Sequence, residues 1–207
     1  MSGIIGRKMG MSSVYNKDGN IVPVTVIQAG PCQVVTIKTA DKDGYQALQL
    51  GFGSRKEKNI SKPVLGQYKK NNLTPSYILK EFRFPEISNY KIGDEIKVDF
   101  FKEGEKIKIR SKSKGKGFQG VMRRHGFGGV GGTTHGQSDR LRAPGSIGAS
   151  SYPSRVFKGQ RMAGRMGFEN TTIANLKVVK IISDKNIVMI KGAVPGSINS
   201  TVVINKK

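Results

Sequence analysis

The chain has 207 residues, a length that suits one domain of ordinary size, with or without an appendage. Its 36 Lys and Arg outnumber its 14 Asp and Glu, and the net charge of +22 favours a polyanionic partner, with nucleic acid first and an anionic membrane surface second. No segment approaches the roughly 20 apolar residues of a membrane span, and a single cysteine excludes an internal disulfide. The N-terminal run MSGIIGRKMGM lacks the apolar stretch of a signal peptide, so we expect a cytosolic or organelle-internal protein that is not bound to a membrane.

Short apolar runs before residue 110 predict β-strands. These runs are rich in β-branched residues or alternate with polar ones, and they occupy 20–28, 32–38, 45–52, 95–101 and 105–110. Asp18-Gly19 and Asp43-Gly44 lie between such runs and supply the positive φ angles that tight hairpins need. Cys32 opens the run CQVVTIK, so we expect it in the core as a small apolar residue.

Helical signal is weak and confined to the middle of this region. The run SKPVLGQYKKNN predicts a short helix over 61–72, with Ser61 near its start and Pro63 in its first turn. This stretch interrupts the strand pattern, so residues 54–89 are interpreted as an α+β insertion.

The segment 110–168 differs from the rest of the chain. It holds 12 of the Lys and Arg residues, 14 of the 27 Gly and one acidic residue, Asp139. Half of the net charge, +11, therefore falls in 59 residues. Only 16 of these residues are apolar, too few to offset the roughly 1–2 kcal/mol per residue that ordering the backbone costs. We expect this segment to become ordered only against another molecule.

Three further strands are predicted after this segment. They occupy 176–182, 186–192 and 200–205, with a turn at 183–186. Closely spaced strands joined by short turns favour a small antiparallel barrel. The predicted fold is mainly β with minor α, a small closed or split antiparallel β-barrel built from residues 1–109 and 169–207. Residues 110–168 are predicted to form a long, basic, extended arm.

The residue types of this arm suit contact with RNA better than they suit a flexible linker. Bulky side chains such as Phe118 and Phe127 stand among the cations, where they can stack on unpaired bases. Lys112, Lys114 and Lys116 alternate with Ser and Gly, so an extended backbone brings them to one side at roughly 7 Å intervals, near the spacing of phosphates. Guanidinium groups add planar forks that bind phosphate with two hydrogen bonds. The candidate arginines are Arg123, Arg124, Arg140, Arg142, Arg155, Arg161 and Arg165.

Other sites that the sequence suggests lack the required surroundings. GKGFQG at 115–120 matches the glycine pattern of a dinucleotide site, but neither KIRSKSK before it nor VMRRHGFGG after it predicts the strand and helix that such a site needs. His125 and His135 are the only histidines, too few for a zinc site with the distant Cys32, and we expect them to stack on or hydrogen-bond to RNA. No carboxylate pair or nucleophile constellation indicates catalysis. We therefore expect no enzyme, no cofactor and no metal.

Five motifs in chain order carry a family resemblance. They are GIIGRKMGM at 3–11, SKGKGFQGVMRRHGF at 113–127, THGQSDRLRAPGSIG at 134–148, RVFKGQRMAGRMG at 155–167 and IKGAVPG at 190–196. Together they extend over nearly the whole chain. In these motifs the chain resembles the large-subunit ribosomal protein L-three family of bacterial type.

The resemblance implies a split barrel like that of translation factors, and an arm that threads into large-subunit (23S-type) rRNA during early assembly. We add to the predicted rRNA contacts three basic residues of the motifs, Arg7, Lys8 and Lys158. The resemblance also places one stretch nearest the peptidyl transferase centre, which the arm would buttress: Ser146, Ile147, Gly148, Ala149, Ser150, Ser151 and Tyr152. The glutamine that some relatives methylate after this motif is absent, because positions 149–151 read Ala-Ser-Ser.

The expected partners follow from the same resemblance. They are the rRNA and the neighbouring proteins L-fourteen and L-nineteen, in the large subunit of a cytoplasmic ribosome, and no homo-oligomer is expected. Two other functions stay open at this stage. A free-standing RNA chaperone would bind any RNA or DNA alike. An RNA-modifying enzyme or translation factor would use the barrel as a catalytic or GTPase-associated module, and the missing catalytic constellations argue against it.

Overall fold

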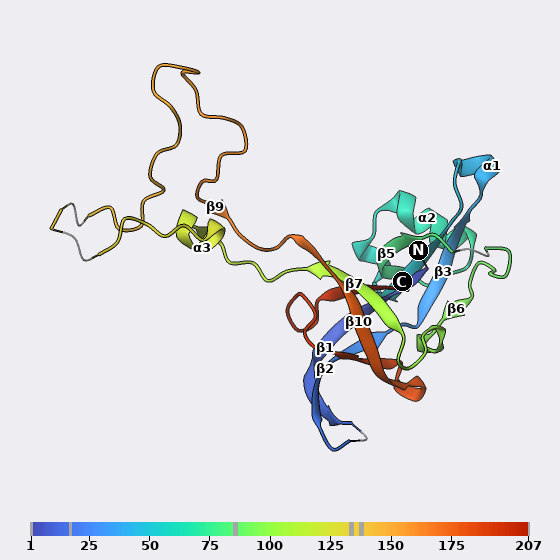
Figure 1. The fold of residues 1–207 in the computed structure, drawn as a ribbon. Helices are drawn as coiled ribbons and strands as arrows, with labels where there is room; N and C mark the ends of the chain where they lie inside the picture. The colour runs from blue at the N-terminus through green and yellow to red at the C-terminus, as the bar shows by residue number, and fades with distance from the viewer. Residues whose placement is uncertain (1, 17, 85–86, 133–134, 137–138, 207) are drawn as a thin grey trace. The chain divides into compact units, whose positions relative to one another are not determined.

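The computed structural model describes residues 2–16, 18–84, 87–132, 135–136 and 139–206. The chain divides into two compact units, which are residues 1–113 with 170–207, here called the barrel unit, and residues 114–169, here called the basic unit. The chain leaves the barrel unit after β7 (Lys106–Lys112) and returns in β10 (Asn170–Ile182), as Figure 1 shows. These two strands pair with Lys112 opposite Asn170, so the basic unit is an insertion between neighbouring strands.

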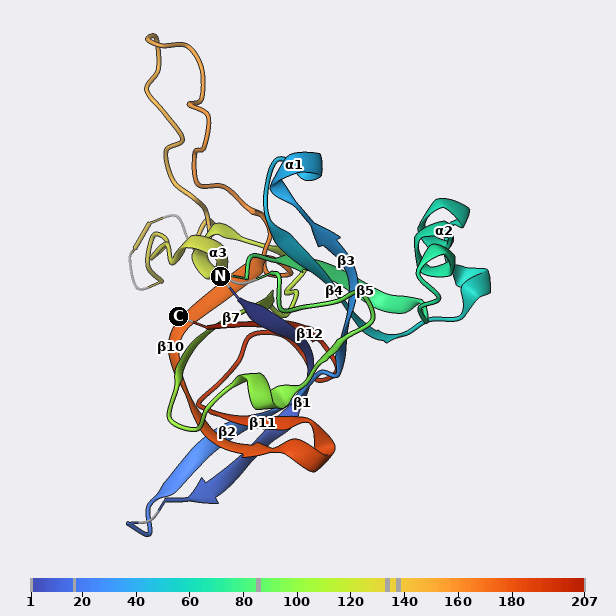
Figure 2. The same cartoon turned by 90° about the vertical axis from the view of Figure 1, so that its right-hand side faces the viewer.

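Six strands of the barrel unit close into an antiparallel barrel, whose ring is visible in Figure 2. Their order around the barrel is β1-β12-β7-β10-β11-β2, and β2 pairs again with β1. Besides β7 and β10, the strands are β1 (Gly3–Tyr15), β2 (Ile21–Ala29), β11 (Ile187–Lys191) and β12 (Thr201–Lys206). The predicted mainly β fold with a closed antiparallel barrel is confirmed.

The alternation of side chains explains why these segments form a barrel. In β7, Ile107 and Ile109 are fully buried, whereas the basic residues between and beside them are exposed or half-buried. In β12, Val202 and Ile204 are fully buried in the same way. A period of two sends every second side chain into the interior of a closed sheet. Each such aliphatic side chain contributes about 1.5–3 kcal/mol when it leaves water.

Three of the predicted barrel strands, including the one at 95–101, belong to a second sheet instead, which corrects the sequence analysis. The runs 32–38 and 45–52 form β3 (Cys32–Lys38) and β4 (Ala47–Ser54). They pair with β5 (Ser76–Phe82) and β6 (Glu95–Ile96) in the order β5-β4-β3-β6. Gly30, with a φ of 80°, follows β2 and lets the chain turn out of the barrel. An alternating pattern identifies a strand but not its partner, because pairing depends on segments far away in the sequence.

The predicted strand at 95–101 is shorter in the structure. Only Glu95–Ile96 pairs as a strand, and a 3-10 turn, η2 (Val98–Phe100), follows it. Val98 and Phe101 are both buried, and their spacing of three suits a helical turn rather than the alternation of a strand.

Short helices lie at the connections between strands. They are α1 (Ala40–Asp43), η1 (Glu57–Asn59), α2 (Lys62–Lys70) and η3 (Ser183–Lys185). The helix predicted over 61–72 is confirmed by α2, which buries Tyr68. Gly19 has a φ of 79° in the turn between β1 and β2, as predicted, whereas Gly44 ends α1 rather than forming a two-residue hairpin. In the described part of the chain, no helix is long and apolar enough to cross a membrane.

One hydrophobic core joins the barrel to the second sheet. Ile4 and Ile5 of β1 belong to the same buried cluster as Leu48 and Leu50 of β4. Cys32 is a fully buried member of this cluster, as predicted, and burial raises the pKa of its thiol to about 12. The barrel unit therefore buries most of its apolar side chains within its own core.

Candidate nucleic-acid interface

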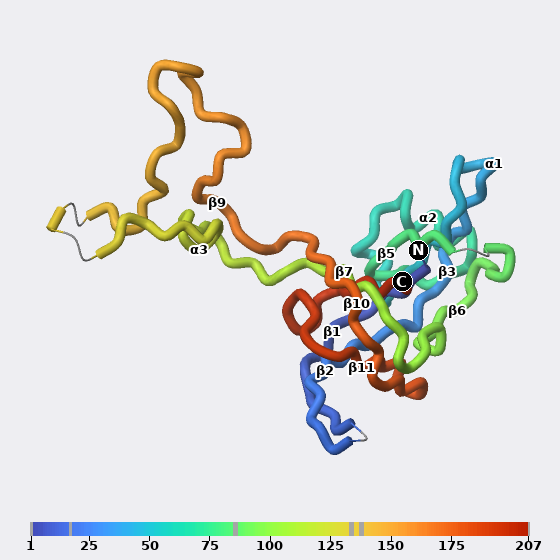
Figure 3. Tube along the Cα trace, in the orientation of Figure 1, coloured from blue at the N-terminus to red at the C-terminus, as the bar shows by residue number. Residues whose placement is uncertain are grey.

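The basic unit has little regular structure of its own. Its described elements are β8 (Phe118–Gln119), α3 (Val121–His125) and β9 (Gly164–Arg165). β8 pairs with β9, the N–H of Lys116 donates to the carbonyl of Met166, and the N–H of Met166 donates to the carbonyl of Gly117, both at 2.9 Å. These hydrogen bonds hold the outgoing and returning legs of the insertion side by side, as the tube in Figure 3 shows.

Two side chains tie α3 to the returning leg. The Arg124 guanidinium donates to the carbonyl of Met162 at 2.7 Å, and His125 Nε2 lies 3.1 Å from the same oxygen. Gly164 leaves room for this clamp, because a Cβ at that position would lie 2.6 Å from Arg124 Nη1. The sequence predicts RNA contacts for Arg124 and His125, and the structure adds a role in shaping the unit. A contact between residues 38 positions apart has no signal in local sequence.

The presence of α3 corrects one detail of the sequence analysis. The run VMRRHGFGG predicts no helix after GKGFQG, yet α3 begins at Val121, directly after Gly120. Met and Arg are good helix formers, and Gly126, with a φ of 74°, ends the helix after five residues. A helix of barely more than one turn still lacks the length that a dinucleotide site requires.

Burial within the basic unit is minimal. Among its described residues, only Val121 is buried, with 3% of its surface exposed. Phe118, Tyr152 and Phe157 expose 77%, 88% and 60% of their surfaces. The predicted lack of a core in this segment is therefore confirmed. The exposed rings are free of intramolecular packing that would keep a base from stacking on them.

Most predicted contact residues of this unit are exposed cations. The structure places these side chains at the surface: Lys114, Lys116, Arg123, Arg140, Arg142, Arg155, Lys158, Arg161 and Arg165. His135 is exposed as well, whereas Arg124 and His125 are half-buried by their clamp. Asp139 and Glu169 are the unit's only acidic residues in the sequence. Positive charge in this unit is therefore largely uncompensated, which suits binding to phosphates.

Three predicted contact residues belong to the barrel unit, and one of them is buried there. Arg7 and Lys112 are exposed on β1 and β7. Lys8 is only 8% exposed, and its ammonium donates to the carbonyls of Val194 and Gly196 at 2.7 Å and 3.0 Å. A phosphate contact for Lys8 stays a prediction, and the structure gives its ammonium another task, which is to hold these two carbonyls.

The stretch Ser146–Tyr152, which the sequence analysis places nearest the peptidyl transferase centre, is exposed throughout. Its described hydrogen bonds are local, from Ser146 Oγ to the carbonyl of Gly148 at 3.0 Å and from Ser154 Oγ to the carbonyl of Ser151. Ile147 exposes 43% of its surface. Apolar side chains that stay in water within their own unit are typical of a surface that meets a partner.

The structure also shows an approach of loops that the sequence does not predict. Residues 127–130 and 143–145 line a pocket of about 370 Å³ within the basic unit. Gly129 makes this approach possible, because a Cβ there would come against the carbonyl of Leu141 and the methyl group of Met122.

Comparison with known proteins places the chain in a family. A family model described as Ribosomal protein L3 matches residues 86–186. Over 205 residues the chain is 55% identical to the large ribosomal subunit protein uL3 of Chlorobium limicola and to that of Chlorobaculum tepidum, covering 99% of this chain and 98% of each relative. It is 54% identical over 201 residues to uL3 of Chloroherpeton thalassium, covering 97% of this chain and 96% of that relative. The chain therefore belongs to the ribosomal protein L3 family: it is a structural constituent of the large ribosomal subunit in the cytoplasm, associated with rRNA and other ribosomal proteins, and not an enzyme.

Proposed function

We propose that the basic unit is the part of the protein that binds and penetrates large-subunit rRNA. The observation that carries this proposal is the combination of exposed, uncompensated cations with a nearly complete lack of buried side chains. A chain segment with this composition gains little from folding alone, whereas phosphates and bases can satisfy both its charges and its exposed rings.

The cations and the rings have different tasks in this proposal. Arginines such as Arg155 and Arg161 grip phosphates with two parallel hydrogen bonds, which fixes the position of the unit without reading sequence. Exposed rings such as Phe118 stack on unpaired bases of the folded RNA. The rRNA is thereby recognised by its shape, and repulsion between neighbouring phosphates is neutralised where RNA helices meet.

We assign the stretch 146–152 to the neighbourhood of the peptidyl transferase centre, which the arm would buttress without taking part in the chemistry. The support is the match of its PGSIG motif to the family and the exposure of Ile147 and Tyr152, which leaves apolar surface for a partner to cover. Within the same proposal the protein joins the rRNA early in assembly, and its protein neighbours are L-fourteen and L-nineteen.

The pairing of β7 with β10 allows a sharp test. Because Lys112 lies opposite Asn170 in this ladder, residues 114–169 can be replaced by a seven-residue Gly-Ser linker without altering the register of the barrel. We expect the shortened protein to fold and large-subunit assembly to stall, as measured by sedimentation of particles from cells that carry only this variant. Normal particles that contain the shortened protein at full occupancy would overturn the proposal.

A second measurement separates this function from that of a free-standing RNA chaperone. The full-length protein is titrated with large-subunit rRNA and with bulk RNA of equal length at the same salt concentration. Shape recognition predicts tighter binding to the large-subunit rRNA, whereas equal affinities would favour the chaperone.

A further inference from the structure

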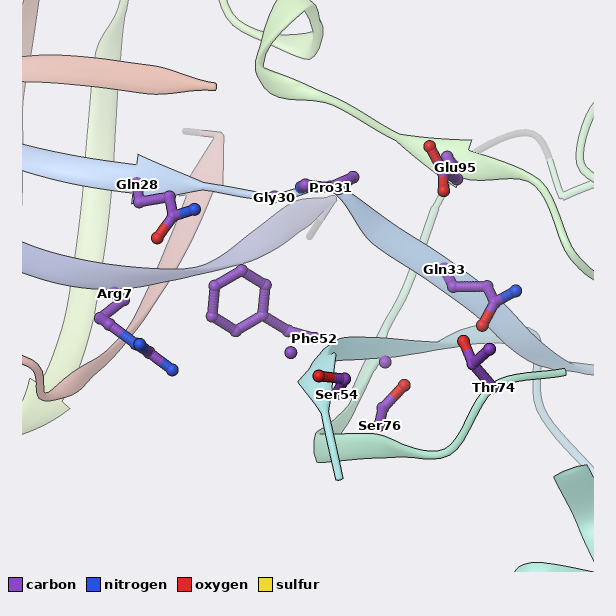
Figure 4. A pocket seen from close by; sticks show the side chains of 12 residues that line it. Arg7, Gln28, Gly30, Pro31, Gln33, Phe52, Ser54, Thr74, Ser76 and Glu95 are labelled. Atoms are coloured by element: carbon purple, nitrogen blue, oxygen red, sulfur yellow. The ribbon is translucent and has the colours of Figure 1, made fainter. Parts of the chain in front are cut away.

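A polar pocket lies within the barrel unit, where the barrel meets the second sheet. Its volume is about 430 Å³, in the range of sites that hold a small ligand. Figure 4 shows Arg7 and Gln28 from β1 and β2 on one side of it, and Gln33 and Glu95 from β3 and β6 on the other. Phe52 of β4 lies between these two groups.

Three polar side chains around this pocket have no partner among the residues that the structure describes. Within the described residues, neither the guanidinium of Arg7 nor the amides of Gln28 and Gln33 make a hydrogen bond or an ion pair. Both glutamines are half-buried, so their amides have lost part of their contact with water without gaining a protein partner. Groups arranged in this way are suited to a ligand that supplies both donors and acceptors.

The chemistry of these groups fits one unpaired nucleotide. A glutamine amide offers a donor and an acceptor side by side and can bind the edge of a nucleobase with two hydrogen bonds. The guanidinium of Arg7 is suited to the phosphate of the same nucleotide. Glu95, across the pocket from Arg7 in Figure 4, is an acceptor for an exocyclic amino group, which adenine, cytosine and guanine have and uracil lacks.

We propose that this pocket binds one extruded, amino-bearing nucleotide of the large-subunit rRNA, with its phosphate and sugar on Arg7 and Gln28 and its base edge on Gln33 and Glu95 across the pocket. The proposal rests on the membership of the protein in the large subunit and does not depend on the task assigned to the basic unit. It gives the barrel unit a base-selective contact in addition to contacts with the RNA backbone.

The first test uses large subunits that carry the double variant Gln28→Ala/Gln33→Ala. Their rRNA is modified with dimethyl sulfate, which reads adenine and cytosine edges, and with kethoxal, which reads guanine. We expect the reactivity of one nucleotide to rise at least about fivefold, because loss of both amides exposes its edge to the reagent. Gln49→Ala is the matched control, since Gln49 is an equally half-buried glutamine on β4 that does not line the pocket.

The second test locates the pocket even if the double variant fails to enter particles. Thr74→Cys places a thiol at the exposed rim of the pocket, and the buried Cys32 does not compete for the reagent. An iron chelate tethered to this thiol generates hydroxyl radicals, and we expect it to cut the rRNA beside one unpaired adenine, cytosine or guanine, which is the nucleotide of the first test wherever both tests give a result.

Three results would overturn the proposal. They are an unchanged rRNA reactivity in particles that contain the double variant at full occupancy, tethered cleavage remote from any reactive nucleotide, and tethered cleavage of a ribosomal protein in place of RNA. The shortened protein without residues 114–169 gives an independent readout, so a failure of the pocket is distinguishable from a failure of the basic unit.

Discussion

The barrel unit and the basic unit differ sharply in how many apolar side chains they bury. The barrel unit buries an aliphatic side chain at nearly every second position of strands such as β7 and β12, and its core continues into the second sheet. The basic unit has Val121 as the one buried side chain among its described residues. One chain therefore combines a segment that buries its own apolar surface with a segment that buries almost none.

The reactivity of thiols should separate the two units most strongly. Burial raises the pKa of Cys32 from 9.0 to about 12, because the charged thiolate is disfavoured away from water. At pH 8 its thiolate fraction is therefore about a thousandfold lower than that of a thiol with the ordinary pKa. We expect iodoacetamide to modify Ser150→Cys rapidly and Cys32 hardly at all, as measured by mass spectrometry of the intact protein.

The pH dependence sharpens this prediction. The alkylation rate of Cys32 should rise about tenfold per pH unit until the pH approaches 12, whereas that of Cys introduced by Ser150→Cys should level off above about pH 9. Comparable rates for the two thiols at pH 8 would contradict a closed barrel unit. Protection of the introduced thiol in assembled subunits would show that the rRNA covers this part of the arm.

Truncation of a single side chain should lower the free energy of unfolding far more in the barrel unit than in the basic unit. Ile109→Ala removes a fully buried side chain from β7, and we expect a loss of about 2–5 kcal/mol in the free energy of unfolding. Phe118→Ala removes a ring that is 77% exposed, and we expect a change within about 0.5 kcal/mol in the free protein. Urea unfolding followed by circular dichroism measures both, and equal losses would mean that the basic unit has a core after all.

Substitution of one lysine in each unit should have opposite effects on stability and on RNA affinity. Lys8→Met leaves the carbonyls of Val194 and Gly196 without their donor, and we expect a loss of about 1–3 kcal/mol in stability with little change in RNA affinity. Lys116→Met should leave the free energy of unfolding unchanged and weaken RNA binding. Weaker RNA binding by Lys8→Met at unchanged stability would instead support the phosphate contact that the sequence predicts for Lys8.

The smallest expected effect concerns a single phosphate contact. Arg161→Ala should lower the slope of log K against log salt by about 0.7–0.9, the value for one neutralised phosphate. The neighbouring Gln160→Ala should leave this slope unchanged, because it removes no charge. Fluorescence anisotropy with a fragment of large-subunit rRNA across a range of salt concentrations measures both slopes. An unchanged slope for Arg161→Ala would mean that Arg161 does not neutralise a phosphate in the complex.

Local patterns predict the barrel but not the assignment of each strand to a sheet. The alternation in 105–110 and 200–205 is visible in sequence because every second residue faces one continuous core. The runs 32–38 and 45–52 have the same alternation, and yet they pair with Ser76–Phe82 in the second sheet. Strand propensity is a local property, whereas the choice of a neighbour is decided by contacts across the whole unit.

In the candidate interface, too, local sequence predicts some features, whereas others depend on contacts between distant parts of the chain. The exposure of Arg155 and Tyr152 was predictable, because the segment around them has too few apolar residues to cover them. The burial of Lys8 was not, because the carbonyls that hold its ammonium belong to Val194 and Gly196, far away in the sequence. Arg124 likewise owes its partner to a fold-back of the chain that no short-range pattern records.

The position of Lys112 opposite Asn170 means that the barrel closes a loop of 57 residues, 113–169, each time it forms that ladder. Closing such a loop restricts its ends, and the entropic penalty falls by about 0.6 kcal/mol for each halving of its length. Replacement of residues 114–169 by seven residues leaves a loop of eight, which is about three halvings. The free energy of unfolding of the barrel without its insertion should therefore be about 1.8 kcal/mol higher than that of the intact protein, as measured by urea unfolding. The inserted basic unit therefore lowers the stability of the barrel unit from which it extends.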